Sequence, residues 1–141
     1  MKLLAGFGLV LTLAAGTLVA EPAADPAAGG GRVFELRTYT ASPGKLDALS
    51  ARFRDHTIAL FKKHGMKVVG FWEPLDKQAG AGEKLVYILA HQSRTAAEAS
   101  WKAFRDDPEW VKVKADSEKS GPLTTKIESV YLAGTDYSPL K

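Results

Sequence analysis

The chain has 141 residues, of which 45% are apolar and 25% charged, the size and composition of one ordinary globular domain. Nineteen Lys and Arg against sixteen Asp and Glu give a net charge of +3 that is spread along the chain, so nucleic-acid binding is not indicated. The absence of cysteine excludes a disulfide scaffold, a zinc–thiolate site, an iron–sulfur cluster, a cysteine nucleophile and a lipid-modified cysteine anchor.

Residues 1–20 have the layout of a secretory signal peptide. Lys2 supplies a positive charge, the stretch from Leu3 to Val19 has none, and Ala20 places a small residue before a polar segment. We therefore expect cleavage after Ala20 and a secreted or periplasmic protein. The alternative is an uncleaved membrane anchor, because the apolar stretch reaches the lower limit of a membrane span. Glycines within it favour cleavage.

Residues 21–31 (EPAADPAAGGG) contain almost no bulky side chain. Such a segment cannot bury enough apolar surface to offset the entropy lost on ordering, so it is predicted to be a flexible linker. The folded domain is expected over residues 32–139.

The first predicted strand runs from Val33 to Thr40, where strict alternation gives two faces. One face carries Phe34, Leu36, Thr38 and Thr40, and the other carries Val33, Glu35, Arg37 and Tyr39. After Ser42-Pro43-Gly44, a helix is expected from Lys45 to His64 and should end at Gly65. Its apolar stripe comprises Leu46, Leu49, Phe53, Thr57, Leu60 and His64. Its basic side chains are expected to be solvated: Arg52, Arg54, Lys62 and Lys63.

Two strands are predicted next, over residues 66–73 and 83–92, and the second is apolar enough to be central in its sheet. Thr95 and Glu98 have the spacing of a capping box at the start of a helix. Asp107-Pro108 should begin another short helix that extends to Ser120. The last predicted strand covers residues 126–132.

The resulting order β-α-β-β-α-β is that of a ferredoxin-like α+β sandwich. Its helices cover only one face of the sheet. The other face needs a second sheet, and a homodimer would supply one. We therefore predict a dimeric α/β barrel.

Five side chains are candidates for a site. Glu35, Arg37 and Tyr39 could line an inter-sheet cavity and hold an anionic ligand through Arg37, although a cross-strand ion pair at a dimer interface is the alternative. His56 lies about 60° from the centre of the helix's apolar stripe and could act as a general base or be a border histidine. Trp72 could stack on a flat ligand or simply pack, as could Tyr87, Trp101 and Trp110.

No metal or cofactor is expected. His56 and His64 are about 12 Å apart along their helix, too far for one ion, His91 would have to come from a strand, and His64 is placed to cap its helix. The sequence has no phosphate-binding loop, nucleophile elbow or nucleic-acid module.

Several strings resemble the NIPSNAP family, within the dimeric α/β-barrel superfamily. They are FELRTYT (34–40), PGK (43–45), RFRDHT (52–57), LFKKHG (60–65), VGFW (69–72), LVYI (85–88), WKAFRDDPEW (101–110), SEKSGPL (117–123) and TDYSP (135–139). The resemblance implies a ferredoxin-like dimer with an inter-sheet cavity. Animal members are mitochondrial and associated with vesicle trafficking and mitochondrial quality control, but the secretory leader is a departure, so that role is not transferred.

Relatives in the superfamily include cofactor-free monooxygenases, haem-degrading enzymes and stress-response barrels. The expected function is therefore an exported homodimer of unestablished activity that binds a small molecule or a partner. An alternative is a cofactor-independent monooxygenase or isomerase that uses His56, Arg37 and Tyr39. A third interpretation, a protein–protein adaptor, predicts an inter-sheet cavity filled by side chains and an apolar patch elsewhere on the surface.

Overall fold

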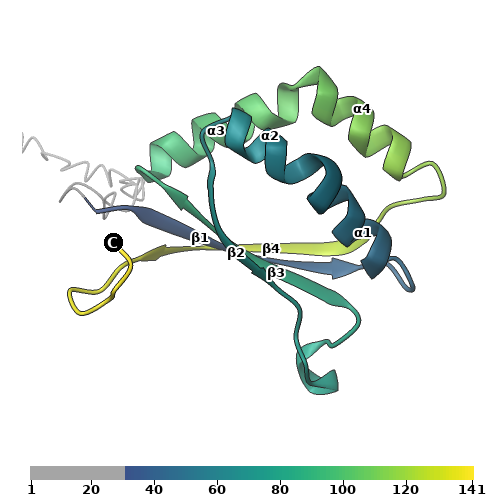
Figure 1. The fold of residues 1–141 in the computed structure, drawn as a ribbon, viewed down its shortest axis with the longest axis horizontal. Coiled ribbons are helices and arrows are strands. Elements are labelled where there is room, and N and C mark those ends of the chain that lie inside the picture. The colour runs from purple at the N-terminus through teal and green to yellow at the C-terminus, as the bar shows by residue number, and fades with distance from the viewer. Residues whose placement is uncertain (1–30) are drawn as a thin grey trace, which may run out of the picture.

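Helices cover one side of a four-stranded antiparallel sheet in the computed structural model, which describes residues 31–141 (Figure 1). The elements are β1 (Val33–Ala41), α1 (Leu46–Arg52), η2 (Phe53–Thr57), α2 (Ile58–Lys63), β2 (Lys67–Trp72), η3 (Lys77–Ala79), β3 (Lys84–His91), α3 (Arg94–Asp106), α4 (Pro108–Ser117) and β4 (Thr124–Ala133). The predicted leader, and the predicted linker up to residue 30, lie outside the described residues.

The strand order is β2-β3-β1-β4, so β1 and β3 are central, as predicted for the apolar third strand. Both neighbours pair with β1 in antiparallel register. This is the ferredoxin-like α+β arrangement that the order of elements predicted. Within residues 31–141, no helix is long and apolar enough to cross a membrane.

The two faces of β1 have opposite surroundings. Tyr39 joins the core with Leu85 and Tyr87 of β3, and Glu35 bonds to Trp101 of α3, so this face lies against the helices. The expected position of Glu35, Arg37 and Tyr39 in an inter-sheet cavity is therefore corrected, because they lie inside one subunit. The reason is that the large tyrosine rings are needed to fill the core beneath the helices.

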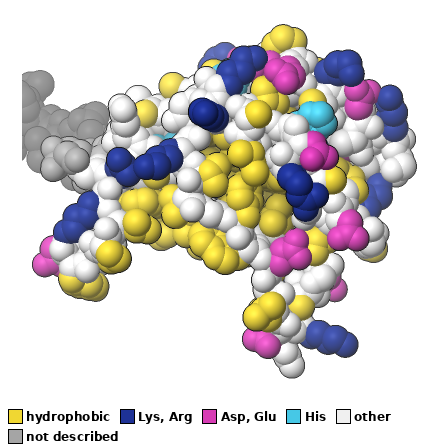
Figure 2. Space-filling model, viewed as in Figure 1, with side chains coloured by type: hydrophobic (Ala, Val, Ile, Leu, Met, Phe, Trp, Pro, Cys, Tyr) yellow, Lys and Arg dark blue, Asp and Glu magenta, His cyan; other side chains and the backbone are white. Residues whose placement is uncertain are grey.

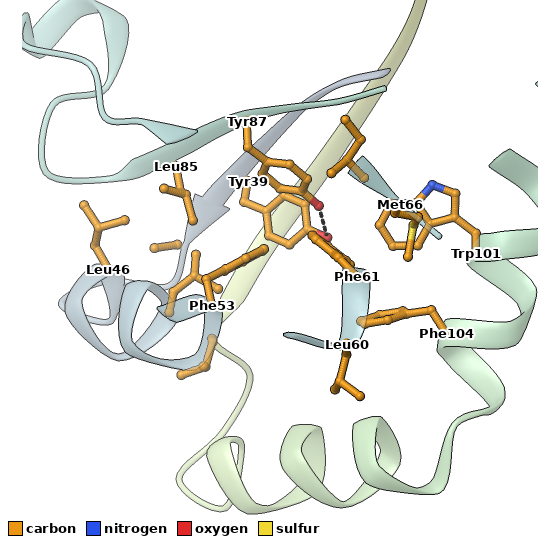
Figure 3. Close-up of a cluster of buried hydrophobic side chains, with 14 residues drawn as sticks. Tyr39, Leu46, Phe53, Leu60, Phe61, Met66, Leu85, Tyr87, Trp101 and Phe104 are labelled. Carbon is orange, nitrogen blue, oxygen red and sulfur yellow. Dashed lines mark hydrogen bonds between the residues drawn. The ribbon is translucent and has the colours of Figure 1, made fainter. Parts of the chain in front are cut away.

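The core is rich in aromatic rings packed edge to face or tilted. The Phe53 and Tyr87 centroids are 5.2 Å apart, and those of Phe61 and Trp101 are 5.5 Å apart. The Tyr87 hydroxyl donates a hydrogen bond of 3.2 Å to the Tyr39 oxygen, so both buried hydroxyls are satisfied (Figure 3). Figure 2 shows hydrophobic side chains gathered between the helices and the strands.

The predicted helix from Lys45 to His64 is present, but a π-helical turn, η2, interrupts it. The Ile58 amide bonds to the Phe53 carbonyl, five residues back, so the turn holds one residue more than an α-helical turn. Arg52, immediately before this turn, is 6% exposed. The expectation that Arg52 is solvated was therefore wrong. Gly65 follows in the left-handed conformation at φ 73°, as predicted.

The helix ends confirm two predicted caps and correct a third. Asp107 caps α4 by accepting a 2.8 Å bond from the Glu109 amide, as predicted. The capping box at Thr95 was wrong, because α3 begins earlier and Ser93 accepts from the Ala96 amide at 3.0 Å. His64 is the C-cap residue of α2, as predicted, and its ring Nε2 lies 2.7 Å from Asp107 Oδ2.

No described helix covers the second face of the sheet, called here the open face. Leu36 of β1 lies on this face, together with the residues opposite it on the neighbouring strands, Ile88 of β3 and Val130 of β4. Several are apolar and partly exposed: Leu36, Val86, Ile88, Val130, Leu132 and Trp72.

Candidate functional site

The buried carboxylate of Glu35 lies on the helix-covered face of β1. Its Oε1 accepts hydrogen bonds from Arg37 Nη1 and Ser129 Oγ, both at 2.7 Å. Its Oε2 accepts from Trp101 Nε1 at 2.6 Å and lies 3.0 Å from His91 Nε2. Glu35 thus joins β1, β3, β4 and α3 through one carboxylate.

The environment keeps Glu35 ionised although its side chain is only 1% exposed. Burial would raise its pKa, but the hydrogen bonds from His91, Trp101, Ser129 and Arg37 outweigh burial and lower the pKa to about 2. All four bonds end on the same two oxygens. Each carboxylate oxygen already accepts two hydrogen bonds, so Glu35 has no free acceptor for a ligand. Its role is to hold its neighbours in position.

Arg37 is held in place by Glu35 and by two rings. Its guanidinium carbon lies 4.2 Å from the centroid of a Trp101 ring, and its Nη2 donates to the Tyr39 hydroxyl at 3.3 Å. Burial lowers its pKa, but the adjacent Tyr87, Tyr39 and Glu35 more than offset this, so the pKa is raised. The buried Nε has no hydrogen-bond partner among residues 31–141.

A pocket of about 550 Å³ adjoins Arg37, between the sheet and helices α3 and α4. We call it the arginine pocket. Its lining residues are Arg37, Tyr39, Arg52, Trp101, Phe104, Arg105, Trp110, Val111, Lys114, Ala115, Glu118, Thr124 and Ile127. Basic and aromatic side chains therefore dominate its wall, with one acidic residue.

Arg52 is the second arginine of this pocket, and its side chain is more deeply buried than that of Arg37. Its Nη1 donates to Glu118 Oε1 at 2.9 Å and to Ser117 Oγ at 3.3 Å, and its guanidinium lies over the Trp110 ring at 5.2 Å. Its Nε is also buried without a partner in the described part of the chain. Each of the two arginines thus contacts one carboxylate and one tryptophan.

The structure brings together only three of the five predicted site residues. Glu35, Arg37 and Tyr39 share one network, and two of them line the arginine pocket. His56 is exposed and lines a separate groove between α1 and α4. Trp72 follows Phe71, which packs against the core, so Trp72 lies on the opposite, open face. There it is 49% exposed and covers Gly70. Neither lines the arginine pocket.

Sequence reasoning missed four members of the site: Ser129, His91, Trp101 as a hydrogen-bond donor, and Arg52. Ser129 lies opposite Arg37 in the register, so the correct assignment of faces would have found it. Arg52 gave no signal, because regular helical spacing puts it off the apolar stripe. Residues 31–141 contain no cluster of three His, Cys, Asp or Glu that could hold a metal.

The fold and the site define a ferredoxin-like α+β protein with a pocket between its sheet and its helices. The NIPSNAP family model matches residues 34–139, and the chain belongs to this family. None of the curated proteins matches the chain.

Solved structures share this fold. A NIPSNAP family protein of unknown function from Agrobacterium tumefaciens is similar with a TM-score of 0.68 and 22% identity, over 79% of this chain and 96% of that one. An uncharacterised NIPSNAP-like domain protein from Burkholderia xenovorans gives 0.66 and 16%, over 78% and 90%. A putative antibiotic biosynthesis monooxygenase from Nitrosomonas europaea gives 0.55 and 13%, over 79% and 96%. At these identities the likeness establishes the fold alone.

Proposed function

We propose that this NIPSNAP protein is an exported homodimer that binds a small molecule in the arginine pocket and does not catalyse a reaction. The observation that carries the proposal is Arg37, a charged side chain fixed at the pocket wall by Glu35, Tyr39 and Trp101. A side chain fixed before binding loses little entropy when a ligand arrives.

The size of the pocket supports binding. Its volume of about 550 Å³ falls within the usual range for small-molecule sites, and it combines aromatic walls with a few polar groups. The adaptor interpretation requires a filled space between two sheets, which is a different space from this pocket.

The open face supports association of two copies. Val130 and Leu132 on β4 are 52% and 40% exposed, and Trp72 on β2 adds a large ring. Neighbouring apolar side chains on a sheet face are typical of a surface that is covered in the assembled protein. The partner we propose is a second copy of the chain, because its open face is apolar too.

The enzyme alternative, a cofactor-independent monooxygenase or isomerase, has less support from the geometry. A general base must reach the proton that it removes. His56 lines another groove, and the described lining of the arginine pocket contains no histidine. Glu35 is ionised but has four hydrogen bonds and does not line the pocket.

A native mass spectrum of the chain, expressed with its leader and purified from the exported fraction, tests the proposal. We expect twice the mass of a chain that begins at Glu21, plus a small bound molecule lost at higher collision energy. A dimer that carries no extra mass would contradict small-molecule binding, and a monomer would contradict the homodimer. A chain that still contains residues 1–20 would contradict cleavage of the leader.

A further inference from the structure

We infer that the ligand of the arginine pocket is an amphiphilic carboxylate, with one anionic head between Arg37 and Arg52 and an apolar body against the tryptophans. The inference rests on the proposed small-molecule binding and adds the chemical class of the ligand. Charge, hydrogen-bonding capacity and the apolar wall each support it.

The charge of the pocket is positive. Four cationic side chains line it, Arg37, Arg52, Arg105 and Lys114, against the single carboxylate of Glu118. Glu35 behind Arg37, at 2.7 Å, and Glu118 beside Arg52, at 2.9 Å, each compensate one guanidinium. Arg105 and Lys114 are left in excess, which favours an anion of low charge.

Arg37 and Arg52 have N–H donors for which the described residues supply no acceptor. A guanidinium has five N–H donors. Arg37 donates to Glu35 and Tyr39, and Arg52 donates through Nη1 alone, to Ser117 and Glu118. Nε of both side chains is buried without an acceptor in the described part of the chain. These two Nε atoms are enclosed by protein, whereas Nη2 of Arg52 is neither hydrogen-bonded to the described residues nor enclosed, so it is the donor that an entering acceptor would meet.

A carboxylate fits this arrangement. Its two oxygens lie in one plane and can each accept from the edge of a guanidinium group, which is itself planar. The guanidinium carbon of Arg37 lies over a Trp101 ring at 4.2 Å, and that of Arg52 lies over the Trp110 ring at 5.2 Å. A carboxylate that binds to the edge of either group leaves these ring contacts in place.

The remaining wall is apolar. Trp101, Phe104 and Trp110 form an aromatic side, with the Phe104 and Trp110 centroids 4.5 Å apart, and Val111 and Ile127 continue it. Such a wall would bury rings or methylene groups of the ligand. A small inorganic anion would leave it in contact with water.

Isothermal titration calorimetry of the exported chain tests the inference with two matched pairs of probes. The pairs are 2-naphthoate with 2-naphthylmethanol, and decanoate with decanol, so that each carboxylate has a neutral partner with the same body. We expect at least one carboxylate to bind at least tenfold more tightly than its alcohol.

Arg52→Gln should weaken binding of that carboxylate at least tenfold. Arg54→Gln is the matched control, because it removes the same charge from an exposed position of the same helix that does not line the pocket. It should leave the affinity within twofold. If Arg52→Gln does not fold, Lys114→Gln, at an exposed position of the lining, should weaken binding severalfold.

Equal affinity for an acid and its alcohol would overturn the carboxylate inference but leave small-molecule binding intact. Failure of all four probes would overturn the inference as well. The mass spectrum of the exported protein would then decide the proposed function separately. Equal losses in Arg52→Gln and Arg54→Gln would show that long-range charge, and not the pocket, is responsible.

Discussion

At the scale of single residues, Glu35 shows how a buried charge can be tolerated. An isolated carboxylate in a protein interior is unfavourable by several kcal/mol, but here four neighbouring groups direct hydrogen bonds at its two oxygens. The same contacts fix Arg37 at the pocket. Stability and the proposed binding site therefore depend on one side chain.

Glu35→Gln should destabilise the protein by about 3–5 kcal/mol. The amide keeps the shape of the side chain, but its NH₂ group points a donor at other donors and leaves Arg37 without its counter-charge. Urea unfolding at neutral pH measures the change. Glu83→Gln, at an exposed position beside β3, is the control and should stay within about 0.5 kcal/mol of the natural protein. Equal effects of the two variants would contradict the role given to Glu35.

The contribution of Glu35 to stability should also depend on pH. Its folded-state pKa is lowered from 4.5 to about 2, so its contribution is present above pH 4.5 and disappears as the pH falls towards 2. The loss amounts to about 3 kcal/mol. The free energies of unfolding of the natural protein and Glu35→Gln, measured from pH 7 to pH 2, should therefore converge in acid. Parallel curves would contradict the lowered pKa.

At the scale of elements, the π turn is the feature that the spacing of apolar residues did not predict. Spacing along residues 45–64 predicts a helix and most of its buried positions, because apolar side chains recur at a helical period. It cannot locate the extra residue of η2, which depends on tertiary packing. Arg52 therefore seemed to be a surface residue, although it is buried at the pocket.

The start of α3 gives a test at this scale. Ser93→Ala should destabilise the protein by about 1 kcal/mol, because the Ser93 hydroxyl satisfies the Ala96 amide at 3.0 Å. Thr95→Ala, at the position that spacing alone favoured, should change stability by less than about 0.5 kcal/mol. Thermal unfolding of the two variants compares them directly. A larger loss of stability from Thr95→Ala than from Ser93→Ala would show that Thr95, and not Ser93, caps the helix.

At the scale of the whole molecule, the order of elements was enough to predict the topology. A β-α-β-β-α-β chain with short connections has few ways to form one sheet, and the apolar composition of β3 predicted its central position. Which face of β1 meets the helices could not. Both faces of Val33 to Thr40 mix polar and apolar side chains, and only contacts distant in sequence, such as Glu35 with Trp101, distinguish them.

The open face gives a prediction about assembly. Leu132→Glu places a charge among the apolar side chains of β4 and should convert the dimer to a monomer, as measured by sedimentation velocity. Leu75→Glu is the control, because Leu75 is 95% exposed in the connection after β2 and should not affect association. A dimer that survives Leu132→Glu would exclude the open face as its interface.

The positions of the three tryptophans give the chain two separate optical reporters. Trp101 and Trp110 line the arginine pocket, whereas Trp72 is half-exposed on the open face. Indole emission shifts to shorter wavelength when water is removed from the ring. Occupation of the pocket should therefore alter the emission of the first two, and association of the sheets should alter that of Trp72. Trp72→Phe would leave the two pocket rings as the remaining indoles, so its fluorescence would follow occupation of the pocket alone.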